Sequence, residues 1–208
     1  MSRADWDYAP ARLLPPRPFL AAAFMLAATV LLYAVEVQEL ASGDALEQNY
    51  CIIGRDDNHL IGILVAPLLH AGWDHLLGNT LAFLLFGFLA MADGFARFVG
   101  VTAMVWLVSG LGVWVFGPPV CTVGVSGVIF GWLLYLLFRG FYARSGRQIA
   151  LAVVLIVMWG GVLWGVLPGQ PGISWQAHLF GALGGILAAR LLARPAWRRR
   201  PEEPVMRQ

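Results

Sequence analysis

Residues 98-FVGVTAMVWLVSGLGVWVFGPPVCTVGVSGVIFGWLLYLLF-138 contain no Asp, Glu, Lys or Arg, and this run decides the class of fold. A helix needs about 20 residues to cross the hydrocarbon core of a membrane, so the run is too long for one crossing. Gly117, Pro118 and Pro119 interrupt it, because glycine and proline disfavour a continuous helix. The run therefore predicts two membrane spans, at about 97–116 and about 123–139.

The overall composition indicates the same class of protein. Of the 208 residues, 59% are hydrophobic and only 12% are charged. A soluble domain of this length needs more charge to cover its surface. The composition therefore excludes an ordinary soluble domain, and the length leaves room for one membrane domain.

Charged residues and helix breakers divide the rest of the chain in the same way. We expect further spans at about 19–40, 75–91, 147–167 and 174–193, which makes six helices in an all-α bundle. The connection 41–74 is polar at first and then apolar over 60-LIGILVAPLL-69. That apolar piece is too short to span and predicts an interfacial or re-entrant segment.

Arginine gives the expected orientation. The chain has 14 Arg and no Lys, and with the N-terminus inside, Arg55 is the one that falls on an outer segment. Because inner segments carry the excess of positive charge, we expect both termini in the cytoplasm. The expected parts are a tail 1–18, a membrane domain 19–193 with the external loop 41–74, and a basic tail 194–208. The basic tail serves as a topology signal and has the charge to bind anionic lipid.

Two cysteines, Cys51 and Cys121, lie in different predicted loops. Two cysteines make no disulfide framework. We therefore expect both thiols to be free, although the sequence leaves their pairing open.

Four polar side chains fall at one depth of the predicted bundle. His75 and Asn79 open the second span, Ser126 opens the fourth and His178 opens the sixth. These three spans begin at the same outer face. Ionisable groups inside a membrane are costly and usually functional.

The chemistry of these residues is that of a nucleophile with a base. A serine hydroxyl needs a base to remove its proton, and neutral histidine suits that role. His178 is the better base, because it stands alone on its helix among small residues. The second to sixth helices contain no carboxylate that could orient His178. We therefore expect Ser126 and His178 to act as a dyad. His75 and Asn79 are four residues apart on one helical face, where their N–H groups and the backbone N–H near Ser126 can hold an oxyanion.

Glycines surround both candidate catalytic residues. Gly124 and Gly127 let backbone and substrate approach Ser126 closely. Gly181 and Gly185 form a small-xxx-small step after His178. We expect this step to pack the sixth helix tightly on the fourth.

Other interpretations of the same residues remain. Serine is common at helix interfaces, so Ser126 alone has a structural explanation. His59 lies in the external connection, where we expect it to be solvated. A metal site at His70, Asp74 and His75 is weakly indicated, because zinc needs three or four converging ligands.

Val128 replaces the last glycine of a GxSxG elbow, which argues against a soluble hydrolase. A transporter would need internal repeats or several intramembrane charges, and a purely structural scaffold would not explain the shared depth.

Taken together, these motifs resemble the rhomboid family of intramembrane serine proteases. The resemblance covers about 55–193 and rests on H-x3-N at His75 and Asn79, GxSG at 124–127 and AH-x2-G-x3-G at 177–185. It implies a serine endopeptidase that cuts transmembrane helices near their outer end. Ser126 would be the nucleophile and His178 the base, with an oxyanion hole from His75, Asn79 and the backbone N–H of Ser126. His70 matches a further histidine with a supporting role.

Two departures from the family pattern are visible. The segment 57-DNHLIGIL-64 lacks the Trp-Arg pair often found in the first loop, and Phe130 replaces a tyrosine that stacks on the catalytic histidine. The chain resembles the minimal six-helix bacterial form, which implies a multi-pass protein of the plasma membrane.

The resemblance also implies partners and a route for the substrate. The partners would be membrane-protein substrates and lipids, with no nucleic acid, metal or cofactor. We expect small residues on both sides of the cut, and lateral access for the substrate beside the fifth helix, which carries Trp159 and Trp164. The alternative is that these two residues are ordinary interfacial tryptophans. The alternative is an inactive rhomboid-like protein that binds transmembrane clients.

Overall fold

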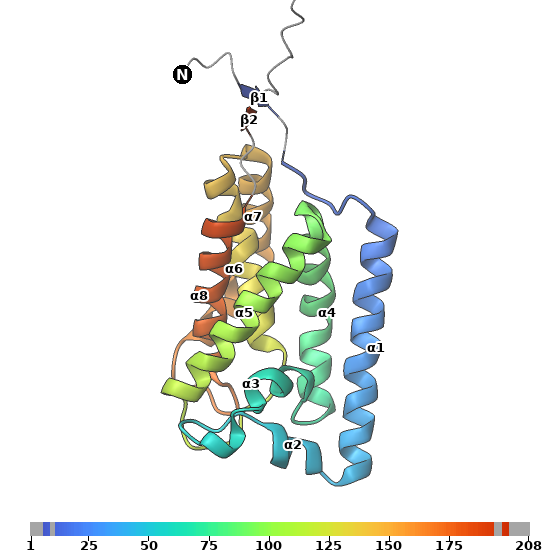
Figure 1. Ribbon diagram of the computed structural model, residues 1–208, viewed down its shortest axis with the longest axis vertical. Helices are drawn as coiled ribbons and strands as arrows, with labels where there is room; N and C mark the ends of the chain where they lie inside the picture. Colours follow the sequence, from blue (N-terminus) through green and yellow to red (C-terminus); the bar gives the residue numbers. More distant parts are fainter. Residues whose placement is uncertain (1–5, 9–10, 194–196, 200–208) are drawn as a thin grey trace, which may run out of the picture.

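The computed structural model describes residues 6–8, 11–193 and 197–199 of the chain. A long helix lies at each of the six places where the sequence predicts a span (Figure 1). These helices are α1 (Pro18–Ser42), α4 (Trp73–Ala90), α5 (Phe95–Phe116), α6 (Ser126–Ala143), α7 (Gly146–Trp159) and α8 (Trp175–Leu192). The strands in the described residues are β1 (Trp6–Tyr8) and β2 (Trp197–Arg199), which pair antiparallel. The expected arginine cluster of the C-terminal tail lies mostly outside the described residues.

Within the described part, five helices are long and apolar enough to cross a membrane. They are α1, α4 with η4 (Met91–Asp93), α5, α6, and α7 with η5 (Gly160–Val166). They indicate an integral membrane protein. Helix α8 is not among the five, because Gln176, His178 and Arg190 lower the apolar character of its 18 residues. The first two of these side chains are buried, so the bundle rather than lipid surrounds them.

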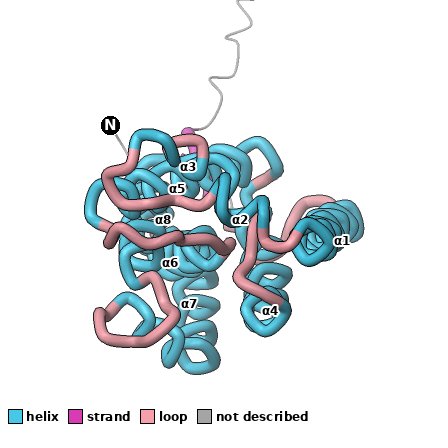
Figure 2. The backbone as a smooth tube through the Cα atoms, turned by 90° about the horizontal axis from the view of Figure 1, so that it is seen from below, coloured by secondary structure: helices cyan, strands magenta, loops and turns pink. Residues whose placement is uncertain are grey.

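Helix α6 lies at the centre of the bundle. Of the 18 most apolar consecutive residues in each helix, 72% are buried in α6, against 22% in α1 and 17% in α7 with η5. Helices α4, α5, α7 and α8 all pack against α6, whereas α1 stands at one edge beside α4 (Figures 1 and 2). Ser126, the first residue of α6, is thus carried by the most buried of these five helices.

Helices α6 and α8 touch through glycines. A Cβ atom on Gly181 would collide with the carbonyl oxygen of Gly127, and one on Gly185 with that of Gly131. Contact at this distance needs residues without side chains on both helices. The starts of α6 and α8 therefore lie side by side, at the end of the bundle that also carries the connection between α1 and α4 (Figure 1).

That connection contains four short helical elements, α2 (Ala45–Tyr50), η2 (Asp57–His59), α3 (Gly62–Val65) and η3 (Ala66–Leu68). Tryptophans of α5 hold it in place, since Trp106 Nε1 donates to the carbonyl of Ile63 at 3.0 Å and Trp114 Nε1 to that of Asp56 at 3.2 Å. The connection is thus anchored on α5 although residues 57–64 contain no Trp-Arg pair. His59 is not simply solvated, because it pairs with Asp56 at 2.9 Å.

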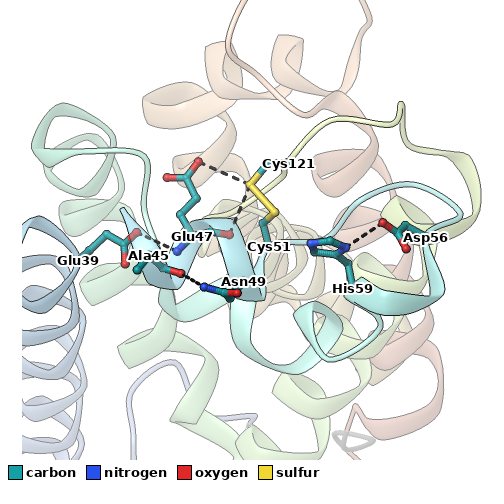
Figure 3. Close-up of a disulfide and its surroundings, with 8 residues drawn as sticks. All are labelled: Glu39, Ala45, Glu47, Asn49, Cys51, Asp56, His59 and Cys121. Atoms are coloured by element: carbon teal, nitrogen blue, oxygen red, sulfur yellow. Dashed lines mark hydrogen bonds and ion pairs between the residues drawn. A yellow bond between two sulfur atoms is a disulfide. The ribbon is translucent and has the colours of Figure 1, made fainter. Parts of the chain in front are cut away.

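The expectation of two free thiols is wrong, because Cys51 and Cys121 form a disulfide (Figure 3). Their loops meet in an antiparallel bridge, in which Ile52 and Thr122 exchange backbone hydrogen bonds of 3.0 and 2.9 Å. The cysteines are 70 residues apart, and only the packed bundle brings their loops together. The bond ties the α1–α4 connection to the loop that leads into α6.

Removing the disulfide should lower the stability of the bundle. A cross-link over a separation of 70 residues restricts the unfolded chain by about 4 kcal/mol in the loop-entropy treatment. We expect Cys51→Ser and Cys121→Ser to melt several degrees below wild type in detergent under non-reducing conditions. A reductant should lower the melting temperature of wild type but not that of the double variant. An unchanged wild-type melting temperature after complete reduction would contradict this expectation.

Candidate active site

The structure brings Ser126 and His178 into direct contact. Ser126 is the first residue of α6, and its hydroxyl donates to Nε2 of His178 at 2.8 Å. His178 belongs to the first turn of α8 and is 8% exposed. The contact of Gly127 with Gly181 sets the spacing of the two helices at this level. A hydroxyl and an imidazole nitrogen at this distance have the geometry of nucleophile and base.

The other ring nitrogen of His178 fixes which nitrogen carries the proton. Nδ1 lies 3.0 Å from the carbonyl oxygen of Gly165 in η5. A carbonyl oxygen only accepts, so Nδ1 must donate, and the neutral ring keeps its lone pair on Nε2. That lone pair faces the Ser126 hydroxyl. Gly165 was missed by the sequence reasoning, because a backbone acceptor has no residue-type signature.

Two neighbours hold the imidazole plane. The ring of Phe130 stacks on His178 with centroids 4.0 Å apart and planes 8° apart. A Cβ atom on Gly165 would lie 3.0 Å from both the His178 ring and the Phe130 ring. The histidine is thus held by an aromatic ring and a glycine backbone, and its orientation does not depend on a carboxylate.

A second pair of polar side chains lies across the site on α4. The backbone N–H of Ala71 points at Nδ1 of His75 at 3.4 Å, so Nδ1 accepts and Nε2 carries the proton. Gly124 has φ +117°, and a Cβ atom there would lie 2.9 Å from that Nε2. The amide nitrogen of Asn79 is buried without a hydrogen-bond partner among the described residues. His75 and Asn79 therefore present N–H donors beside the glycine loop that precedes Ser126.

The start of α6 adds backbone donors to the same site. The first N–H groups of a helix have no partner within the helix. The residue before α6, Val125, gives no side-chain cap. The backbone N–H of Ser126 therefore makes no hydrogen bond within α6, unlike the N–H groups of later residues in the helix.

His70 lies behind His75, and the two rings meet edge to face at 5.2 Å. It is 1% exposed, and neither ring nitrogen has a partner among the described residues. Burial, with a smaller effect of His75, lowers the pKa of His70 to about 4, so the ring is neutral near pH 7. Its contact with His75 is one of ring packing. In the described part of the chain, no three His, Cys, Asp or Glu side chains converge as metal ligands.

A cavity of about 700 Å³ joins these groups. Ser126, His178, His75, Asn79 and Phe130 all line it. Its other walls include the loop around Cys121, the end of η5 and the residues that lead into α8. The four polar residues that the sequence places at one depth thus face one space, and the remaining glycines, Gly127, Gly181 and Gly185, act through helix packing.

Comparisons with known proteins agree with this architecture. The Rhomboid domain family model matches residues 57–195. An uncharacterized protein of Mycobacterium tuberculosis is 42% identical over 189 residues, which cover 86% of this chain and 78% of the relative. An uncharacterized protein of Mycobacterium leprae is 44% identical over 174 residues, covering 79% and 68%. A Bacillus subtilis protein named "Putative rhomboid protease YdcA" is 34% identical over 143 residues, covering 65% and 69%. With more than half of its length matched by the family model, the chain belongs to the rhomboid family.

Proposed function

We propose that this protein is an intramembrane serine endopeptidase that cuts transmembrane substrates near the outer face of the membrane. The observation that carries the proposal is the hydrogen bond of 2.8 Å from the Ser126 hydroxyl to Nε2 of His178. Family membership supports the same reaction class. An inactive binder would have no use for a serine aligned with a correctly protonated base.

In the proposed reaction, Ser126 Oγ attacks the scissile carbonyl carbon and His178 Nε2 takes the hydroxyl proton. The carbonyl of Gly165 stabilises the imidazolium that forms, because it accepts from Nδ1 at 3.0 Å. The C–N bond then breaks and Nε2 returns the proton to the leaving amine. Water, activated by His178, hydrolyses the acyl-serine ester and regenerates the enzyme.

The negative oxygen of the tetrahedral intermediate needs donors that are already in place. We assign this role to Nε2–H of His75, the Asn79 amide and the backbone N–H of Ser126. The buried amide nitrogen of Asn79 lacks a partner in the described residues, so the substrate would supply the acceptor it is missing.

The cavity would supply water, which the lipid excludes. We propose that α8 is the sixth span, that both termini are cytoplasmic and that the cavity opens on the outer face of the plasma membrane. The substrate must unwind to expose its scissile carbonyl, since a helical carbonyl is already paired. We place its access beside α7 and η5, where Val157 is 80% exposed and Trp164 67% exposed, and we expect small residues at the cut.

Loss of either dyad residue should abolish cleavage. We expect Ser126→Ala and His178→Ala to reduce cleavage of a single-span substrate in liposomes by a factor on the order of 10⁴ or more. The double variant should be no worse than either single variant, because the two residues act as a unit. Unchanged melting temperatures would show that each variant is folded.

Labelling by a fluorophosphonate gives an independent readout of an activated serine. Wild type should be labelled and Ser126→Ala should not, whereas the matched control Ser42→Ala, in the last turn of α1, should label like wild type. Absence of labelling and cleavage in folded wild type would instead favour the inactive rhomboid-like binder.

Loss of one oxyanion donor should slow the chemical step without preventing binding. We expect Asn79→Ala to lower kcat about 10²-fold or more with a smaller change in KM. Leu77→Ala is the control and should retain activity, because Leu77 is on the same helix, is 56% exposed and does not line the cavity. If Asn79→Ala changed KM alone, the amide would contribute to binding rather than to the oxyanion hole.

A further inference from the structure

The cavity that contains Ser126 has an unbalanced charge on its walls. Glu47 of α2 and Asp74 of α4 both line it, and none of its lining residues is an arginine. The chain has no lysine. Within the described residues, neither carboxylate belongs to an ion pair. The other polar lining residues, such as Gln170, Gln176 and Ser174, are uncharged.

The position of Glu47 is firmly set. The carboxylate of Glu39 accepts from the backbone N–H groups of Leu46 and Glu47 at 3.1 and 2.8 Å, which fixes the first turn of α2. Cys51 follows α2 and is bonded to Cys121, whose Sγ lies 3.6 Å from Glu47 Oε1 (Figure 3). The Glu47 side chain therefore stands against the loop that leads into the nucleophile rather than in open solvent.

The surroundings of Glu47 add negative charge. Seven of the 12 acidic residues lie between Glu36 and Asp74, together with one arginine, Arg55. Burial, followed by the charges of Glu39 and Asp44, raises the pKa of Glu47. A cation bound beside Glu47 would offset this repulsion.

We infer that Glu47 and Asp74 are specificity-determining residues that select substrates with a lysine or arginine close to the cut on its outer side. This inference rests on the proposed function. The outer side follows from the substrate itself, because the inner side of the cut continues into hydrocarbon, where a cation is costly. Charge pairing at such a partly exposed site affects encounter and binding more than the chemical step.

The test uses substrates that differ at one position. The transmembrane segment and cut site stay constant, and one residue on the outer side is Lys, Ser or Glu. We expect kcat/KM in neutral-lipid vesicles to be about five- to tenfold higher for Lys than for Ser at low ionic strength, and lowest for Glu. The preference should shrink in about 0.5 M salt, which screens exposed charges.

Variants assign the effect to the cavity. Glu47→Gln and Asp74→Asn should each reduce the Lys preference, and the double variant should remove it while still cutting the Ser substrate. The matched control is Asp57→Asn, an exposed carboxylate of the same connection that does not line the cavity. It should keep the wild-type preference.

The outcomes separate this inference from the proposed function. Cleavage of no substrate would contradict the proposed function. Equal cleavage of the three substrates, or a Lys preference that survives the double variant, would overturn the inference alone. An equal loss in Asp57→Asn would also overturn it, because the general field of the outer face would then be the cause.

Discussion

The contact between the glycines of α6 and α8 is the constraint on which the rest of the structure depends. With Gly127 against Gly181 and Gly131 against Gly185, the two backbones approach as closely as carbonyl oxygens permit. Lipid provides no hydrophobic force between helices, so close packing of small residues is a main source of association. The same contact sets the distance from Ser126 to His178. Stability of the bundle and geometry of the site thus come from one interface.

The site shows how a histidine can be oriented inside a bundle of apolar helices without a carboxylate. A buried carboxylate would bring a charge that hydrocarbon penalises. Here the Gly165 carbonyl accepts from Nδ1 of His178, and the Phe130 ring fixes the plane. The Gly165 carbonyl and the Phe130 ring are both neutral. They hold His178 with its proton on Nδ1 without burying a charge. The irregular turns of η5, which bring Gly165 to the histidine, are tolerated because they line a cavity.

The sequence predicted the positions of all six long helices, because breaks in apolar runs depend on local chemistry alone. It also placed Ser126, His178, His75 and Asn79 at one level, since spans and their direction determine depth. It failed where long-range packing decides the outcome. The pairing of Cys51 with Cys121 requires two loops to meet, and the role of Gly165 resides in a backbone atom. The polar character of α8 was visible, but its shielding by α5 and α6 was not.

Helix α6 is fixed at both ends by polar contacts of different kinds. At the end opposite Ser126, the fully buried Arg139 lies 3.9 Å from Asp93, and the Tyr135 hydroxyl donates to the same carboxylate at 3.1 Å. A rotation or slide of α6 would separate these groups, and a buried charge without its partner is costly. The glycine contacts with α8 resist the same movement. The position of Ser126 is therefore determined along the whole length of its helix, as the proposed role of nucleophile requires.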